Sequence, residues 1–282
     1  MQRTTAILSV SALAAIVALG QGRRTDANGS ASSATAVAVE WLAPRPPSNN
    51  EAPVISFAQD LPASVRADLK NRGGIEFSAG TVEELSGVIK VVMGRCLPRY
   101  THRLIEENLS KVYVVRDLTV YGVRALGTFE PDTRTILICY RQQERDAKAT
   151  NVHRLTELVF HHEFLELMLA RHRPKFAESE WRNALPSGFE YDPSHGERDP
   201  DRMTCDAEQL REGFVAPYSR SQLPDDVSML AMNMFVRPSR VWEWSKESLP
   251  LAKKVDILQE FYFRLDPRMD RVFFAGMKDS PE

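Results

Sequence analysis

The sequence predicts an α+β fold in which a small antiparallel or mixed sheet packs on one long helix and a mostly helical half follows. Three observations predict it. Strand-forming runs precede the long helix, a helical pattern of apolar residues fills Val152–Arg171, and two more helical runs follow at Pro224–Val236 and Leu251–Phe263. Runs of strands followed by runs of helices indicate an α+β domain.

The strand signals lie just before the long helix. Consecutive β-branched and aromatic residues predict a strand over Lys111–Val115. Two further β-rich runs, Tyr121–Phe129 and Thr133–Tyr140, are separated by Glu130-Pro131-Asp132, which is typical of a hairpin. The apolar run Ile136-Leu137-Ile138 indicates a strand that is covered on both faces.

Helical patterns also precede the strands. They cover Leu61–Asn71, Thr81–Val92 and Pro98–Leu109, and Gly73-Gly74 separates the first two. The Pro- and Gly-rich stretch Pro174–Ala207 is predicted to be mostly irregular.

Length and composition are those of an ordinary globular protein. The chain has 282 residues, of which 43% are hydrophobic and 26% charged. Its formal net charge is -2 and no basic stripe is visible, so a nucleic-acid partner is not expected.

The N-terminus has the pattern of a signal peptide over residues 1–20. Arg3 supplies a positive charge, Ala6–Leu19 is an apolar run, and small residues precede a cleavage position after Gly20. A single-pass anchor is the alternative, but the run is shorter than the ~20 apolar residues of a spanning helix. We therefore expect a secreted or periplasmic protein with no stable membrane insertion after cleavage.

The segment after the signal peptide has little to bury. Residues 21–50 are rich in Ala, Ser, Asn, Arg and Pro, so residues 21–54 are predicted to form a flexible tether and 55–282 the packed domain. Export permits disulfides, and one pair plus one free thiol is the simplest arrangement of Cys96, Cys139 and Cys205. No C-x-x-C spacing suggests a cysteine metal site.

The long helix carries the residues of greatest chemical interest. On a helical wheel, His162 and Glu166 lie near the middle of an apolar stripe, with Glu163 at one border and His161 at the other. The stripe is made of Leu155, Leu158, Val159, Leu165 and Leu169. A titratable residue in a buried stripe costs several kcal/mol unless it is paired or bound to a cation.

Three interpretations compete for this helix. His162 and Glu166 could satisfy each other as an i,i+4 ion pair with no function. They could instead be two metal ligands on adjacent turns, with Glu163 as the base, which is the geometry of H-E-x-x-H helices. In the third, His161 or His153 supplies the ligand and His162 is a core residue.

The sequence resembles a known family over much of residues 95–265. The likeness rests on His161-His162-Glu163-Phe164, on the hairpin region, on Trp181–Tyr191 and on the phrase Gly213–Ser221 that precedes Asp225-Asp226. The family is the zinc-binding metallopeptidases of secreted bacterial proteins with a gluzincin-like H-E-x-x-H helix. The resemblance implies a zincin-like fold and a metal-dependent peptidase.

Carried over position by position, the resemblance implies that His162 is the first metal ligand and Glu163 the general base. Glu166 stands where the family has its second His, giving a variant H-E-x-x-E helix. Asp225 stands where the family has a Glu ligand, and Met229 where another acidic residue is expected. The change to Met229 is the one that indicates loss of a metal site, because methionine replaces an expected acidic residue.

One imidazole and two carboxylates would cancel the charge of a divalent ion, so bound water would be polarised less than in a two-His site. Oxygen ligands widen the choice of metal from Zn²⁺ toward Mn²⁺ or Fe²⁺. If the site has lost its function, it would bind no metal ion.

Asp225, Asp226 and Tyr218 also have structural interpretations that involve no catalytic or metal-binding role. Asp225 and Asp226 follow Pro224 in the first turn of a helix, where acidic residues simply complement the helix dipole and where Ser221 or Gln222 could cap. Tyr218 could donate to a developing oxyanion or merely pack in the core.

The sequence therefore favours a secreted metal-dependent hydrolase that cleaves a peptide or protein substrate with a metal-activated water. In this hypothesis His162, Glu166 and Asp225 are ligands, and Glu163 and Tyr218 are catalytic. The alternative is a non-enzymatic binding protein on the same fold with a buried His–Glu pair. No pattern predicts an oligomeric state.

Overall fold

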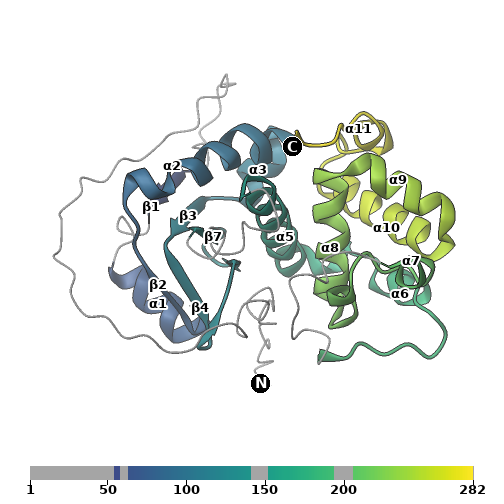
Figure 1. The fold of residues 1–282 in the computed structure, drawn as a ribbon, viewed down its shortest axis with the longest axis horizontal. Helices are drawn as coiled ribbons and strands as arrows, with labels where there is room; N and C mark the ends of the chain where they lie inside the picture. Colours follow the sequence, from purple (N-terminus) through teal and green to yellow (C-terminus); the bar gives the residue numbers. More distant parts are fainter. Residues whose placement is uncertain (1–53, 58–62, 141–151, 194–205, 282) are drawn as a thin grey trace.

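The computed structural model describes residues 54–57, 63–140, 152–193 and 206–281. Two small sheets lie on one side of a long central helix, α5 (Val152–His172), and most of the C-terminal helices lie on the other (Figure 1). The predicted α+β class is confirmed. The predicted signal peptide and nearly all of the predicted tether lie outside the described residues. Within the described ranges no helix is both long and apolar enough to cross a membrane.

The first sheet has four strands in the order β1-β3-β7-β6. They are β1 (Val54–Phe57), β3 (Lys111–Val115), β7 (Thr135–Cys139) and β6 (Gly127–Glu130). The first three strands are parallel, and β6 pairs antiparallel with β7. The strand predicted at 111–115 and the hairpin on either side of Pro131 are both confirmed. Strand β6 lies at the edge of the sheet.

The second sheet was not predicted as a separate unit. It is antiparallel and contains β2 (Ile75–Ser78), β4 (Asp117–Val120) and β5 (Val123–Arg124). The prediction of one strand over Tyr121–Phe129 is wrong, because Tyr121 and Gly122 adopt positive φ angles of 49° and 78° in the turn between β4 and β5. Within the run Tyr121–Phe129, β5 therefore belongs to the second sheet and the start of β6 to the first.

Strand β7 is covered on both faces, as its apolar run predicted. Ile136 and Ile138 belong to a large core shared with α5, whereas Leu137 and Cys139 belong to a smaller core shared with the second sheet. Alternate residues of a strand point to opposite faces, so a strand with no polar face must be covered twice.

The helices before the strands follow the predictions with one break. They are α1 (Ala63–Gly73), α2 (Val82–Val91), a π-turn at Val92–Cys96, a 3₁₀ turn at Leu97–Arg99 and α3 (His102–Asn108). The helix predicted over Pro98–Leu109 is therefore wrong in its first turn. Tyr100 is extended, and Thr101 caps α3 by accepting a hydrogen bond from the backbone N–H of Leu104.

The half after α5 is helical but more finely divided than predicted. Its elements are a 3₁₀ turn at Arg173–Lys175, α6 (Glu178–Asn183), α7 (Ala207–Arg211), the 3₁₀ turn η8 (Pro217–Arg220), α8 (Leu223–Val236), α9 (Pro238–Glu247), α10 (Leu249–Leu265) and α11 (Arg271–Ala275). Helices α8 and α10 were predicted, whereas α6, α7, α9 and α11 were not. Three of these, α6, α7 and α11, have only five or six residues and give little periodic signal.

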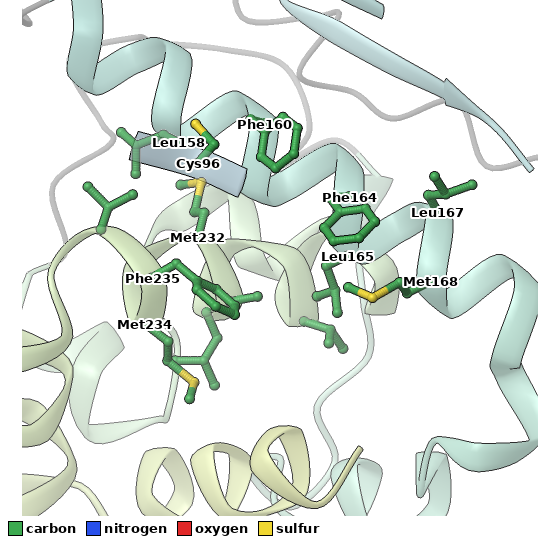
Figure 2. Close-up of a cluster of buried hydrophobic side chains, with 14 of the residues drawn as sticks. Cys96, Leu158, Phe160, Phe164, Leu165, Leu167, Met168, Met232, Met234 and Phe235 are labelled. Carbon is green, nitrogen blue, oxygen red and sulfur yellow. The ribbon is translucent and has the colours of Figure 1, made fainter. Parts of the chain in front are cut away.

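Helices α5 and α8 pack against each other through a dense apolar layer (Figure 2). From α5, Phe160 and Phe164 enter this layer, and from α8, Met232 and Phe235, all of them buried. Cys96 lies in the same cluster, and Cys96 and Cys139 are both buried and not bonded to each other. A disulfide between these two is therefore excluded, and Cys205 lies outside the described residues.

Candidate metal centre

The polar residues in the middle of α5 are buried on every side. His161, His162 and Glu163 are each 0% exposed, and Glu166 is 2% exposed. The wheel placed His161 and Glu163 at the borders of the apolar stripe, but α5 contacts the sheet through β6 and β7 and contacts α8 elsewhere. The helix therefore has no solvent-facing border along this stretch. Four titratable side chains are held inside the protein.

Asp225 of α8 joins two of these side chains. His162, Glu166 and Asp225 each offer one ligand atom, and the three atoms lie within 4.8 Å of one another. Asp225 is itself 0% exposed. Its Oδ2 atom accepts a hydrogen bond from the Ser221 hydroxyl at 2.5 Å. An acidic residue that only complements a helix dipole would face solvent, so this alternative does not describe Asp225.

The structure leaves this cluster with unused hydrogen-bonding atoms. Among the described residues, no hydrogen-bond partner is found for either ring nitrogen of His162, either carboxylate oxygen of Glu163 or Oδ1 of Asp225. His162 Nε2 and Glu166 Oε1 lie 3.4 Å apart as an ion pair. Of the five atoms named above, only His162 Nε2 takes part in this ion pair. Buried polar atoms are normally paired, so the donor set fits a divalent cation bound among these residues.

The charges of the cluster shift the pKa of each of three members. Burial lowers the pKa of His162, but the carboxylates of Glu166, Glu163 and Asp225 outweigh it and raise that pKa to about 9. Burial, with the charges of Glu166 and Asp225, raises the pKa of Glu163 to about 8. Burial and Glu166 raise the pKa of Asp225 to about 7. The metal-free cluster therefore retains protons at neutral pH that it must lose to bind a cation.

These shifts predict how stability depends on pH when no metal is bound. A folded-state pKa above the unfolded value means that the stabilisation is complete at low pH and is lost as the pH rises through the folded value. Between pH 7 and 9, Glu163 and His162 titrate in the folded state while their unfolded counterparts are already deprotonated. In EDTA, the free energy of unfolding from urea titrations should therefore fall from pH 7 to pH 9.

The matched control for this pH series is Glu163→Gln, which should make the decline shallower. A stability that is constant or increases over this interval would contradict the predicted charge distribution.

Glu163 is confined by the edge strand of the first sheet. A Cβ atom at Gly127 of β6 would lie 2.7 Å from Val159 Cγ1, 2.8 Å from Glu163 Cγ and 2.9 Å from Glu163 Oε1. Only glycine allows α5 and β6 to approach this closely. Nothing in the sequence around Gly127 predicted this role, because the contact forms between elements distant along the chain.

Gly127→Ala is expected to displace Glu163 and to destabilise the protein by about 1–3 kcal/mol, the usual cost of overpacking a core. The matched control is Gly87→Ala in α2, where a Cβ meets nothing within 4 Å and alanine is the better helix former. Thermal unfolding would show a lower midpoint for the first variant and an equal or higher one for the second. Equal midpoints for Gly127→Ala and wild type would show that the close approach does not constrain Glu163.

Tyr218, on η8, borders the same cluster. Its side chain is buried, and its ring centroid lies 6.4 Å from that of His162. Burial and the charges of Asp225, Glu166 and Glu163 raise the pKa of Tyr218 well above its usual value. The phenol therefore stays protonated and can donate a hydrogen bond into the cluster.

The other histidines of α5 lie apart from this group. His161 Nδ1 is hydrogen bonded to the Tyr100 hydroxyl at 2.7 Å, and its ring stacks on Phe235 at 4.9 Å between centroids. Burial lowers the pKa of His161 well below its usual value, so it is neutral. His153 is exposed. Neither belongs to the group of His162, Glu166 and Asp225, so the geometry favours His162 as the ligand.

Two residues near the cluster were not identified as site residues. Ser221 was considered only as a helix cap, yet its hydroxyl contacts Asp225, and Gln222 at the N-cap position makes no side-chain cap. The signal was present in the sequence, since a hydroxyl four residues before Asp225 can reach it across one turn. Asp226, considered a dipole residue, is 1% exposed and bonds to Lys254 instead.

Comparison with known proteins adds little to this geometry. No protein-family model matches the chain, and no curated protein matches it. Among solved structures, the chain is similar to a crystal structure from Bacteroides caccae described as a "putative zinc-binding metallo-peptidase". The TM-score is 0.39 and the identity 14%, and the match covers 68% of this chain and 74% of the other. Likeness at this level assigns no residue a role.

Proposed function

We propose that this protein is a metal-dependent hydrolase of the metallopeptidase type, with His162, Glu166 and Asp225 as its metal ligands. The observation that carries the proposal is the convergence of these three buried side chains, whose ligand atoms lie within 4.8 Å of one another. The packing of α5 against α8 brings them together. A cation at this position would neutralise the two carboxylates and leave His162 uncharged.

The residues beside the ligands supply the remaining functions of a hydrolase. Glu163 lies one position along α5 from His162, and neither of its carboxylate oxygens has a hydrogen-bond partner among the described residues, so in the metal-bound, deprotonated state they could accept a proton from water. Tyr218 is a protonated donor on a different element, η8. When bound, the metal would polarise the attacked carbonyl and the water as a Lewis acid. Peptide bonds are the proposed substrate class, because the order of His162 and Glu163 on the helix is that of H-E-x-x-H peptidases.

The ligand set favours weak Lewis acidity. One imidazole and two carboxylates neutralise a divalent charge, so less polarisation is available than in a site with two imidazoles and one carboxylate. We propose Zn²⁺ as the native ion, with Mn²⁺ or Fe²⁺ as alternatives that carboxylate oxygens also accept. We also propose that the protein acts outside the cytoplasm, as its N-terminal sequence predicts.

Full burial of the cluster supports a second candidate function. The polar residues of the cluster are at most 2% exposed, and His162 and Glu166 lie at ion-pair distance. A binding protein on the same fold could keep them as a neutralised pair with no metal and no reaction. In that case Glu166→Gln would lower stability, and added metal would change nothing.

The metal content of the purified protein tests the first proposal. After dialysis the protein should retain close to one equivalent of transition metal, and readdition of Zn²⁺ or Mn²⁺ to stripped protein should raise its melting temperature. At a metal concentration 100 times the Kd, the expected stabilisation is about 2.7 kcal/mol. Asp225→Asn should lose this response. Far less than one equivalent, together with an unchanged melting temperature, would favour the second candidate.

A further inference from the structure

The residue that follows the proposed ligand Asp225 is the centre of a separate polar network. Oδ2 of Asp226 accepts hydrogen bonds from Trp181 Nε1 at 2.9 Å, the Tyr191 hydroxyl at 2.9 Å and Lys254 Nζ at 2.8 Å. Asp226 and Lys254 are almost completely buried, at 1% and 0% exposure. One carboxylate oxygen therefore ties α8 to α6, to the segment after α6 and to α10.

Lys254 extends the network to the segment that leads into the site. Its ammonium group also donates to the carbonyl oxygen of Gly213 at 2.8 Å and lies 4.1 Å from the ring centroid of Phe214. Gly213 precedes η8, and Asp226 lies in the first turn of α8. Lys254 thus holds both ends of the stretch that contains Tyr218 and Ser221.

The proposed ligand itself has few other restraints. Oδ1 of Asp225 has no hydrogen-bond partner in the described part of the chain, and Oδ2 accepts a hydrogen bond from Ser221, only four residues away. The first turn of α8 has no side-chain cap from Gln222. The position of Asp225 relative to α5 therefore depends on the packing of α8 against α5 and on whatever fixes the backbone of the first turn of α8.

We infer that Asp226 and Lys254 are positioning residues that hold the first turn of α8 so that Asp225 faces His162 and Glu166. They touch none of the proposed ligand atoms and act through the backbone of α8. A buried ion pair adds little to stability compared with apolar residues of similar volume, but it can specify one arrangement of the elements that it joins. The inference rests on the proposed metal site.

The double variant Asp226→Asn/Lys254→Met tests this role. It removes both charges while keeping similar volumes, and the amide introduced in place of the Asp226 carboxylate keeps an oxygen acceptor for Trp181 and Tyr191. The Kd for Zn²⁺, measured by competition with a chelator at pH 7, should rise about 10-fold to 100-fold, as when groups that orient ligands are removed. A crystal structure of the metal-free variant should show the Asp225 carboxylate displaced from His162.

A gentler variant and a control complete the experiment. Tyr191→Phe removes one hydrogen bond at a partly buried position and should weaken Zn²⁺ binding in the same direction by a smaller factor. Asp266→Asn removes charge from another buried carboxylate, one bonded to Thr101 and Arg268, and should lower the melting temperature without changing the Kd.

The outcomes separate the two proposals. Wild-type protein that binds Zn²⁺ while the folded double variant binds it with the same Kd would overturn the positioning role alone. If the double variant does not fold, an unchanged Kd for Tyr191→Phe overturns the positioning role. Wild-type protein that binds no metal would overturn the proposed function, and the positioning role with it.

Discussion

Glu163→Gln should greatly reduce peptide hydrolysis while leaving metal binding intact. The substitution keeps the size of the side chain and removes the carboxylate beside the proposed ligands that is not itself a ligand. General-base catalysis contributes about 10²-fold to 10⁴-fold, so kcat/KM for a sensitive peptide substrate should fall by about 10³-fold. Glu163 already carries a proton at neutral pH in the metal-free protein, since its pKa is raised to about 8, so folding should change little.

Glu157→Gln is the matched control for this loss. Glu157 is also 0% exposed on α5, but it pairs with Arg95 at 2.9 Å. Its substitution should lower stability and leave the kcat/KM of the folded enzyme within a few-fold of wild type. A Glu163→Gln variant with wild-type hydrolysis would exclude Glu163 as the base, and hydrolysis that persists in EDTA would exclude the metal mechanism.

Glu166→His should bind Zn²⁺ more tightly than the wild-type protein and hydrolyse peptides faster. An imidazole is a better zinc ligand than a second carboxylate, and the site would regain a net positive charge that polarises water more strongly. We expect the Kd for Zn²⁺ to fall about tenfold or more, equivalent to ~1.4 kcal/mol. Chelator competition measures the affinity, and fluorogenic peptides measure the rate.

Glu166→Gln separates the two functions proposed for the same position. If Glu166 is a ligand, this variant loses the thermal response to added metal. If His162 and Glu166 are only a buried pair, Glu166→Gln and Glu166→His both lower stability, and neither variant responds to Zn²⁺. The opposite responses of the His and Gln variants are the strongest evidence that this position can provide.

Local patterns predicted the elements near the site with good accuracy. The helix over Val152–Arg171 differs from α5 by one residue, and the strand over Lys111–Val115 is β3 itself. Both have a continuous apolar pattern that matches one period. The run at Tyr121–Phe129 was misinterpreted because its β propensity is uniform, whereas a left-handed turn at Tyr121 and Gly122 divides the neighbouring residues between two sheets.

The sequence predicted the roles of some polar residues correctly and missed the roles of others. His162 and Glu166 were recognised because both lie in one apolar stripe, a property that a helical wheel displays. Asp226 was interpreted as a dipole residue, and its bonds to Trp181 and Lys254 come from elements far away in the chain. Local charge patterns do not reveal whether a carboxylate is buried, so its partners could not be inferred.

The spacing of His162 and Glu166 along the chain is enough to predict a titratable pair one turn apart within a long helix, because positions on a helix follow from local geometry alone. The same pattern indicates that these buried side chains must be paired with each other or bound to a cation. The tertiary structure was needed to bring Asp225, which the family resemblance had suggested, next to this pair, and to show that Gly127 abuts Glu163. Those contacts depend on how α5 packs between β6 and α8, and that packing is fixed by the complementary shapes of many side chains at once.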